Sequence, residues 1–575
     1  MQYKLIENSL NDIFQAKKTI FNNRQFDYKL YKEKIKTNNL NYYNPDELFN
    51  MDKAVKCYLK HIYGKHNITI LVDDDVDGMT SAAMIYLYTQ KIQPDCKIQY
   101  ILHKEEKHGL SDYITIPEDT DLLIIPDAGS NDIEQCEKYF NQGIDIIVLD
   151  HHNIEKINPY AIVVNSKDGY YPNQDLSGAG VVYKFLQAID FEEWTNYADD
   201  YLDLTALGII SDNMAVNVLE NRLIIDKGLS KINNKLFSAL IKSQEYSLQN
   251  NCYGIDIQFY ITPLINALIR VGKQDEKELL FNAFVENYQV FPYKKRGQTE
   301  VVDEDIYTRV ARIAKNCHSR QKRMVDKYID TIISNIKDNN LDKNEIIFAN
   351  VSGLFKQHLT GLIAAKLADY YKKPCLLLHL TNDKQYLIGS GRNYNYSKVN
   401  NLQKELLSTN EFEFVSGHNN AFGVKINKDN IKNVIENTNN KLKKIEKQHC
   451  DLVDFIIDEE ELSLSLIKDV YDMNPFLGVK FEPIKIAVEN IIVNLNNVNI
   501  IGKNFDTLKF QNDEGVEFIK FKIAEDDAIY NCMLECDSES DNKVKINAIC
   551  KVGFNTYNGL MIPQAIIENY EIINN

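Results

Sequence analysis

Between residues 68 and 165 the chain alternates short, almost continuous apolar runs with longer stretches of helical character. The apolar runs are ITILVD (68–73), IQYIL (98–102), DLLIIPD (121–127), IDIIVLD (144–150) and AIVVN (161–165). Runs that are apolar on both faces indicate buried strands, and their alternation with helices predicts a parallel sheet covered on both faces. In such sheets chemistry gathers beyond the carboxyl ends of the strands.

Aspartates stand at the ends of three of these runs. Asp73, Asp127 and Asp150 close their runs, and Asp75 and Asp77 follow Asp73 at a spacing of two. An aspartate after a strand is often a helix cap or a turn residue, and for any one of them alone we favour that interpretation. Carboxylates this close resist ionising together unless a cation lies among them. Taken together, they predict a cation site at one edge of the sheet.

Two histidines and a further acid add to this edge. His151 and His152 follow Asp150 directly, and the segment GIISDNM (208–214) places Asp212 after an apolar stretch. Oxygen ligands suit a hard divalent cation, and imidazole favours manganese over calcium. Two such ions that share a carboxylate would hold the attacking and leaving oxygens of a phosphoryl transfer.

Net charge and cysteine content limit the kind of protein and the compartment in which this chemistry is expected. The 575 residues carry a formal net charge of −17, which argues against a generally basic nucleic-acid-binding surface but permits a local positive groove. The 10 cysteines stand at irregular positions without a signal peptide or a long apolar run. We therefore expect free thiols, a reducing compartment and a cytoplasmic protein without a membrane partner.

The segments DDDVDGMTSA (73–82), PDAGS (126–130), LDHH (149–152) and GIISDNM, in this order and spacing, resemble the DHH phosphoesterase superfamily. Within it the chain is similar to the RecJ family of single-strand-specific DNA exonucleases. The resemblance extends through YITPLINALIRVGK (260–273), HLTGLIAAKLADYYKKPCLLL (358–378), GSGRNY (389–394), SGHNNAFGV (416–424) and NPFLGVKFEP (474–483), and covers about residues 68–570.

The resemblance implies a role for each residue of the acidic edge. It implies that two ions, Mn²⁺ or Mg²⁺, are held by Asp73, Asp75, Asp77, Asp127, His151 and Asp212 or their immediate neighbours. Asp127 is the best candidate for the bridging carboxylate. Asp150 and His152 are the expected catalytic residues: Asp150 would orient His151 through a hydrogen bond, and His152 would face the scissile phosphate.

A second set of residues is expected to bind the substrate. In GSGR, small residues allow backbone donors to reach a phosphate, and arginine adds a bidentate contact, although a glycine-rich turn alone is weak evidence. The expected substrate-binding residues are Asn266, Arg270, Ser390, Gly391, Arg392, Gly417 and His418. The chain departs from the family in LHKEEKHGL (102–110), where His103, Lys104 or Lys107 would replace an arginine.

The predicted fold class is α/β, with several domains along the chain. We expect a mainly helical N-terminal segment (1–66), a DHH catalytic domain with a parallel sheet (67–300) and a connector helix (301–340). These are followed by a smaller α/β DHHA1 substrate-binding domain (341–445), a linker (446–483) and an OB-like nucleic-acid-binding β-barrel (484–575).

The resemblance implies a metal-dependent 5′-to-3′ exonuclease that hydrolyses single-stranded DNA in recombination, repair or replication. A helicase and a single-strand-binding protein are the partners that it suggests. One alternative is a DHH-family nanoRNase or cyclic-dinucleotide phosphodiesterase, which shares the metal motifs but would not need the C-terminal barrel. The other alternative is a non-catalytic RecJ-like replication scaffold. Such a protein would have lost metal ligands, whereas this sequence keeps them.

Overall fold

The computed structural model describes residues 1–7, 9–37, 43–104, 108–111, 113–248, 251–295, 297, 299–394, 397–445, 450–502, 506–523, 527–534, 542–557 and 560–573. The chain folds into two compact units. The first comprises Met1–Ile265, Glu278–Ala311 and Cys450–Asn575, and the second comprises Asn266–Lys277 and Arg312–His449. The finer division into domains given above stays a prediction.

A five-stranded parallel sheet forms the centre of one region of the first unit. Its strands are β2 (Ile68–Val72), β3 (Ile98–Leu102), β4 (Leu122–Pro126), β5 (Asp145–Asp150) and β6 (Ile162–Asn165), in the order β3-β2-β4-β5-β6. All four ladders are parallel. The predicted parallel sheet is therefore confirmed, with each strand within one or two residues of its apolar run.

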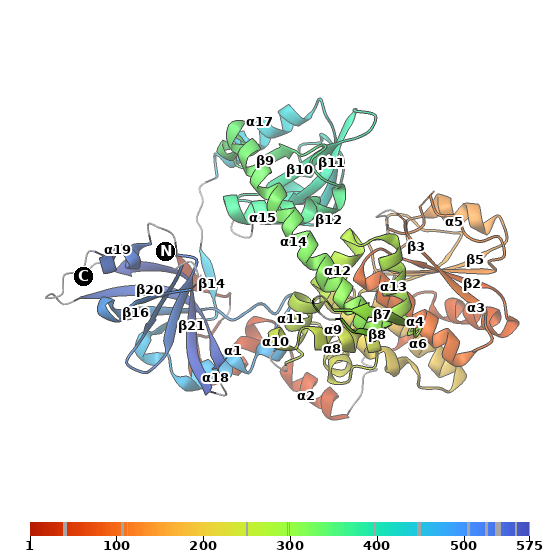
Figure 1. Ribbon diagram of the computed structural model, residues 1–575, viewed down its shortest axis with the longest axis horizontal. Coiled ribbons are helices and arrows are strands. Elements are labelled where there is room, and N and C mark those ends of the chain that lie inside the picture. The colour runs from red at the N-terminus through yellow and green to blue at the C-terminus, as the bar shows by residue number, and fades with distance from the viewer. Residues whose placement is uncertain are drawn as a thin grey trace. The chain divides into compact units, whose positions relative to one another are not determined.

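Helices cover both faces of this sheet, as Figure 1 shows. On one face, α5 (Ile133–Phe140) contributes Cys136 and Tyr139 to a buried cluster with Leu71, Leu123 and Val148. On the other face, α3 (Met51–Gly64), α4 (Val76–Ile92) and α6 (Gly178–Glu193) pack against the strands. Because both faces are covered, the strands are apolar throughout, and polar groups concentrate at the strand ends.

The rest of the region between the sheet and the connector helix is mainly helical. It contains α7 (Leu202–Ser211), α8 (Leu219–Ser230), α9 (Lys235–Ser243), α10 (Glu245–Leu248), α11 (Gly254–Asp256), α12 (Thr262–Val271) and α13 (Gln274–Phe284). The antiparallel hairpin β7 (Val290–Lys294) and β8 (Val301–Asp305) precedes the long helix α14 (Ile306–Asp338).

The C-terminal part of the first unit is a seven-stranded sheet. Its strands are β15 (Phe455–Asp458), β16 (Ile486–Asn494), β17 (Asn499–Ile501), β18 (Thr507–Gln511), β19 (Glu517–Phe521), β20 (Lys543–Tyr557) and β21 (Leu560–Ile573), accompanied by α18 (Leu464–Tyr471) and α19 (Ala528–Leu534). The order is β15-β16-β20-β21-β19-β18-β17. Among the described strands, β15 and β17 remain edges that do not pair with each other, so the predicted OB-like barrel is not confirmed.

The N-terminal segment joins this C-terminal part. It contains β1 (Tyr3–Leu5), α1 (Ala16–Asn23) and α2 (Tyr28–Thr37), and β1 pairs in parallel with β14 (Asp451–Val453). Next to this pair, Arg24 forms a buried ion pair with Asp454, and its Nη2 also donates to the carbonyl of Glu482 at 3.1 Å. The chain's first residues are therefore held against residues more than 400 positions away.

The second unit is built on a five-stranded sheet of order β12-β13-β11-β10-β9. Its elements after α14 are β9 (Ile347–Asn350), α15 (Thr360–Tyr371), β10 (Cys375–Leu380), β11 (Tyr386–Arg392), α16 (Leu402–Leu407), β12 (Phe412–His418), β13 (Ala421–Asn427) and α17 (Ile431–Leu442). Val325, Ile332 and Ile336 of α14 are buried in the cluster that includes Ile363 and Leu377. The apolar side of the connector helix thus packs into the core of the second unit.

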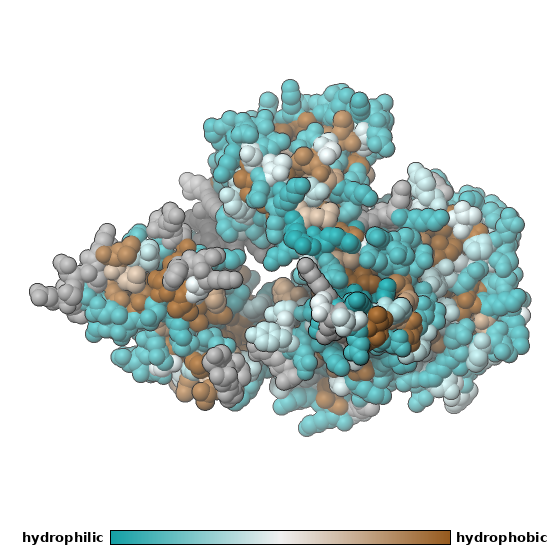
Figure 2. Space-filling model, viewed as in Figure 1, coloured by the Kyte–Doolittle hydropathy of each residue, from teal (hydrophilic) through white to brown (hydrophobic). Residues whose placement is uncertain are grey.

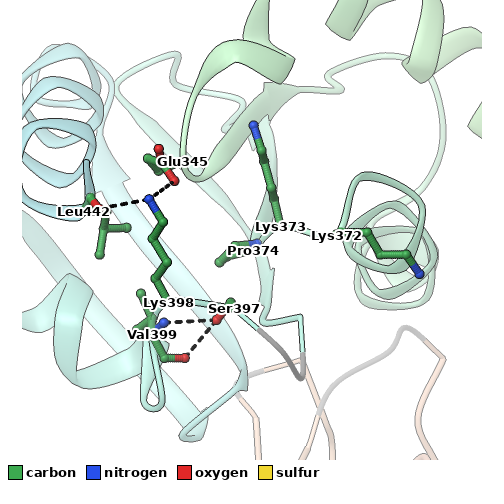
Figure 3. Close-up of a pocket in the computed structure, with 8 residues that line it drawn as sticks. All are labelled: Glu345, Lys372, Lys373, Pro374, Ser397, Lys398, Val399 and Leu442. Atoms are coloured by element: carbon green, nitrogen blue, oxygen red, sulfur yellow. Dashed lines mark hydrogen bonds and ion pairs between the residues drawn. The ribbon is translucent and has the colours of Figure 1, made fainter. Parts of the chain in front are cut away.

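Three lysines are among the residues that line a small pocket of about 150 Å³ in the second unit, and Figure 3 shows how one of them, Lys398, is engaged. Lys398 Nζ lies 3.1 Å from Glu345 Oε2 and donates to the carbonyl of Leu442 at 3.3 Å. Lys373 donates to the backbone carbonyls of Asp342 and Asn344. The ammonium groups of Lys373 and Lys398 connect neighbouring segments of the protein, so a structural role explains why these lysines line the pocket.

Hydrophilic residues predominate on the face of the molecule in Figure 2, and the hydrophobic residues there form separate patches. Within the described part of the chain, no helix combines the length and the apolar character that crossing a bilayer requires.

Candidate active site

The carboxyl ends of the three central strands bring together acids that lie far apart in the sequence. Asp73 directly follows β2, Asp127 directly follows β4, and Asp150 is the last residue of β5. Because β4 lies between β2 and β5 in a parallel sheet, these three residues emerge at the same edge. All three are buried. The predicted convergence is therefore present.

The start of α4 fixes two more acids at this edge. Asp75 is the N-cap of α4 and accepts a hydrogen bond from the backbone N–H of Gly78 at 2.9 Å. Asp77 lies in the first turn and caps a different helix, since its carboxylate accepts from Ser177 Oγ, Gly178 N and Ala179 N at 2.6–3.0 Å. The N-terminus of α6 thereby orients Asp77 and favours its charged form.

Asp127 has an unusual backbone and an unsatisfied oxygen. Its φ of +65° is in the left-handed region, and its N–H donates to the carbonyl of Leu149 at 2.7 Å. A Cβ at position 178 would lie only 2.5 Å from Asp127 Cβ, so glycine is required there. Asp127 Oδ1 is buried and receives no hydrogen bond from the described residues. A buried acceptor without a donor is costly, and a bound cation would satisfy it.

His151 joins two of the acids. Its Nε2 lies 3.2 Å from Asp127 Oδ1 and 3.3 Å from Asp212 Oδ2. Asp212 is the C-cap of α7, so this contact connects the edge of the sheet with the end of a helix. The sequence interpretation placed all three residues in one site, and the structure brings them together.

The Asp150 carboxylate is hydrogen-bonded to the ring of His152, whereas the ring of His151 was the expected partner. We expected it to orient the ring of His151, but its Oδ1 accepts from His151 through the backbone N–H and from His152 Nδ1 at 2.8 Å. The tight turn after β5 directs the second histidine ring back to the carboxylate. Although burial alone would raise the pKa of Asp150, the hydrogen bond and charge of His152 lower it below its ordinary value. The carboxylate therefore stays ionised.

The segment after β3 supplies a histidine that the sequence interpretation missed. His108 Nδ1 lies 2.5 Å from Asp73 Oδ2, and the hydrogen bond and charge of Asp73 raise the pKa of His108 to about 9. His103 Nε2 lies 3.9 Å from Asp73 Oδ1, whereas Lys107 is outside the described residues. The segment LHKEEKHGL contains this histidine beside Gly109, whose backbone N–H also donates to Asp73 Oδ1 at 2.9 Å.

The charges at this edge repel one another. Burial, followed by the charges of Asp77 and Asp75, raises the pKa of Asp212 to about 8. Burial and Asp75 raise the pKa of Asp77 to about 6, and burial together with the neighbouring acids raises that of Asp127 well above its ordinary value. Without a cation, several of these carboxyls are thus partly protonated near neutral pH.

The donor set suits divalent cations. Among the described residues of this edge, three groups have ligand atoms within 4.8 Å of one another: Asp127 with His151 and His152, Asp77 with His151 and Asp212, and Asp73 with Asp75 and His108. Carboxylate oxygens with imidazole nitrogens fit a cation of the manganese class. The unsatisfied Asp127 Oδ1 supports the same conclusion, so these groups could hold metal ions.

These pKa shifts predict how the metal-free protein responds to pH. A carboxyl whose folded-state pKa exceeds its unfolded value binds more protons when folded, so stability falls as pH rises between the two values. For Asp212 this window extends from 3.8 to about 8. In EDTA, the melting temperature of Asp212→Asn should therefore exceed that of the wild type by a margin that grows between pH 4 and pH 8. A margin independent of pH would contradict the assigned repulsion.

The residues expected to bind substrate lie in the second unit. Arg392, at the end of β11, pairs with Ala421 of β13, which in turn pairs with His418 of β12. Arg392 and His418 therefore share one row across the sheet, and Gly391 and Gly417 share the adjacent row through Phe422. Ser390 pairs with Gly423 in the row beyond. The side chain of His418 lies outside the described residues.

Arg392 lies against the start of α15 and is close enough to a second arginine, Arg270, to be affected by its charge. The guanidinium group of Arg392 lies against Gly361 near the start of α15, where a Cβ would force it to shift. Burial, followed by the charge of Arg270, lowers the pKa of Arg392. Arg270 and Asn266 both lie on α12. Two neighbouring guanidinium groups form a local positive site in an otherwise acidic chain.

Comparisons with known proteins agree with this geometry. The family model for the N-terminal domain of the DHH family matches residues 67–209, which span the sheet and α6. YorK of the SPbeta prophage in Bacillus subtilis strain 168, provisionally named a single-strand DNA-specific exonuclease, is 37% identical over 583 residues, covering 100% of this chain and 98% of YorK. The single-stranded-DNA-specific exonuclease RecJ of the same organism is 24% identical over 553 residues, covering 93% of this chain and 65% of RecJ.

The fold is also found among solved structures. The crystal structure of RecJ in complex with Mn²⁺ from Thermus thermophilus matches with a TM-score of 0.71 at 13% identity, covering 100% of this chain and 79% of that one. The alignment with YorK covers the whole chain and shows that the two proteins are homologous over their full length. This chain therefore belongs to the DHH family, in the group that contains YorK and RecJ.

Proposed function

We propose that this chain is a metal-dependent exonuclease that hydrolyses single-stranded DNA from the 5′ end. The observation that carries the proposal is the buried acidic and histidine cluster at the carboxyl edge of the sheet, in a chain related over its full length to YorK. The relatives' names supply the substrate class, and the positive site of the second unit supplies the reason for the 5′ polarity.

We assign the acidic cluster to two divalent cations, Mn²⁺ or Mg²⁺. Their ligands would be the six residues expected from the sequence (Asp73, Asp75, Asp77, Asp127, His151 and Asp212), with His108 as an addition from the structure. When bound, the cations would neutralise charge on the phosphodiester and make a water molecule nucleophilic near neutral pH. Asp127 touches both His151 and the start of α6 and is the candidate for the shared ligand.

His152 would contact the scissile phosphate directly. Its Nδ1 is engaged by Asp150, and 57% of its side chain is exposed, so Nε2 is available to a substrate. Burial would lower the pKa of His152, but the bond to Asp150 raises it to about 9. At neutral pH the ring is therefore an imidazolium that can donate a charge-assisted hydrogen bond to a phosphate oxygen. Asp150 acts by fixing the ring and its charge.

Arg392 and Arg270 would bind the terminal 5′ phosphate. A phosphate between two guanidinium groups relieves their repulsion and gains bidentate hydrogen bonds. Asn266, Ser390, Gly391, Gly417 and His418 would contribute polar or close backbone contacts beside them. All seven of these residues belong to the second unit.

This assignment predicts a selective loss of activity. Arg392→Ala should reduce kcat/KM for 5′-phosphorylated strands by about 10-fold to 100-fold, because a charge-assisted contact of about 1.5–3 kcal/mol is lost. The value of kcat/KM for 5′-hydroxyl strands should fall much less. Lys425→Ala, on the same sheet but four residues beyond Ala421 along β13, is the matched control. Equal losses on both substrates would mean that Arg392 follows the backbone in general.

Metal dependence provides the test of the proposed chemistry. The protein stripped of metal with EDTA should leave end-labelled single strands intact, and addition of Mn²⁺ or Mg²⁺ should restore their degradation. Calcium should restore much less, because it prefers more oxygen ligands and tolerates imidazole poorly. Degradation that continues undiminished in EDTA, after removal of trace nucleases by a second purification, would overturn the proposal.

A further inference from the structure

A second group of metal-binding side chains lies away from the candidate active site. Cys57 and His61 are four residues apart on α3, so both point to the same side of the helix. They meet Asp145, the first residue of β5, and His61 Nε2 lies 2.8 Å from Asp145 Oδ2. One ligand atom from each of the three residues lies within 4.8 Å of the other two.

The position of this group separates it from the acidic cluster. Asp145 begins β5 and Asp150 ends it, so the strand's rise of about 3.3 Å per residue puts the two sites about 17 Å apart at opposite ends of the sheet. Nothing in the proposed hydrolysis uses Cys57, His61 or Asp145. Their donor set also differs, since a sulfur and a nitrogen accompany a single carboxylate.

His61 has the surroundings of a metal-bound imidazole. Its Nδ1 lies 3.0 Å from His66 Nδ1, so with Nε2 on a cation the Nδ1–H could donate to His66. A ligating histidine usually makes such a bond through its other nitrogen. His61 is buried and burial lowers its pKa, which keeps the ring neutral and able to coordinate.

An ion pair provides the alternative explanation for part of this group. Lys60 Nζ lies 2.8 Å from Asp145 Oδ2, and its side chain is 62% exposed. An exposed pair of this kind contributes at most about 1 kcal/mol, so a cation could displace the lysine. The ion pair accounts for Lys60, His61 and Asp145, but it gives no reason for the thiol of Cys57 beside the same carboxylate.

We propose that Cys57, His61 and Asp145 bind one divalent transition cation of the zinc class, which fastens α3 to the start of β5. Sulfur, nitrogen and oxygen ligands in a set of three leave a fourth tetrahedral position for water on the exposed side of Asp145. Cys57 would release its thiol proton to solvent on binding. The mixed donor set favours zinc or cobalt over magnesium, in contrast to the acidic cluster.

Cobalt absorption tests the site in the full-length chain. Reduced, metal-free protein is titrated with Co²⁺ in excess Mg²⁺, which occupies oxygen-rich sites without absorbing. We expect thiolate-to-cobalt charge-transfer absorption that saturates at a stoichiometric amount of Co²⁺ and disappears on addition of Zn²⁺. Cys57→Ser should abolish it, whereas Cys252→Ser, which removes a similarly half-buried thiol outside the group, should leave it unchanged.

Circular dichroism in EDTA must show that Cys57→Ser folds like the wild type. Absence of the absorption from the wild type, or its persistence in folded Cys57→Ser, would overturn the proposal.

His66→Ala leaves all three ligands in place and should weaken Co²⁺ binding by about 10-fold to 100-fold. Lys60→Ala should bind Co²⁺ at least as tightly as the wild type, because a competitor for Asp145 is gone, and weaker binding would contradict the proposed displacement.

Discussion

Asp127→Asn should lower the rate of single-strand hydrolysis by about 10³-fold under saturating metal, since the loss of several kcal/mol of charge stabilisation corresponds to this factor. The expectation rests on the buried, unsatisfied Oδ1 and on its contact with His151. Asparagine keeps the shape of the side chain but removes the charge that would bind the cations. The rate is measured as initial release of end-labelled product in Mn²⁺.

Two controls distinguish this effect from a folding defect. Asp74→Asn removes a neighbouring acid that belongs to none of the three groups proposed to hold the cations, and it should retain most of the activity. Asp127→Asn should also melt at a higher temperature than the wild type in EDTA, because a repelling charge is gone. Turnover close to that of the wild type in Asp127→Asn would eliminate the assigned role of this residue.

Asp454→Ala should destabilise the protein by about 3–5 kcal/mol, because it leaves the buried guanidinium group of Arg24 without its counter-charge. The side chains of Arg24 and Asp454 are only 4% and 1% exposed. Asp454 also accepts from Asn23 Nδ2 at 3.0 Å and from the backbone N–H of Lys485 at 3.1 Å. One substitution therefore disrupts the join between α1 and the C-terminal sheet. Urea unfolding followed by circular dichroism gives the difference in free energy.

The matched control for this prediction is Asp469→Ala. Asp469 lies 3.3 Å from Lys17, but both side chains are about a third exposed or more, at 43% for the lysine and 32% for the aspartate. Such a pair contributes about 1 kcal/mol or less. If Asp454→Ala and Asp469→Ala lowered the free energy of unfolding by similar amounts, burial would not determine how much these ion pairs stabilise the protein.

The strands of the catalytic sheet could be predicted from the sequence because they are buried on both faces. A continuous apolar run such as ITILV needs no partner to be recognised, and the order of strands in a parallel sheet then brings their carboxyl ends together. Asp73, Asp127 and Asp150 were therefore assigned to one edge from their positions alone. Asp212 was added to this edge from its place after an apolar stretch, and only the resemblance gave it a role as a metal ligand, since nothing local distinguishes it from any other helix C-cap.

The hydrogen bonds within the site could not be predicted in the same way. Whether Asp150 holds His151 or His152 depends on the turn after β5, and adjacent histidines carry no sequence signal that separates them. His108 and Gly109 both contact Asp73, a residue more than 30 positions earlier, so this contact depends on tertiary structure. Asp77 accepts a hydrogen bond from Ser177, the N-cap of α6, which lies 100 residues later, so its partners depend on tertiary packing.

The C-terminal region shows a different limit. Alternating apolar residues predicted strands, and strands are present, but closure of a barrel depends on whether the edge strands meet in register. The ladders place β15 and β17 at opposite edges. The pairing of β1 with β14 was missed because a three-residue edge strand in a polar segment has no detectable periodicity.

The central claim is that the acidic cluster hydrolyses single-stranded DNA, and a side-by-side digestion tests it most directly. Purified protein in Mn²⁺ is given 5′-labelled single strands, the same strands as blunt duplexes, and dinucleotides, with Asp127→Asn and EDTA as the controls. We expect the single strands to be degraded from the 5′ end, with early release of the label, while duplexes stay largely intact. Degradation confined to dinucleotides, or equal degradation of duplex and single strands, would contradict the account.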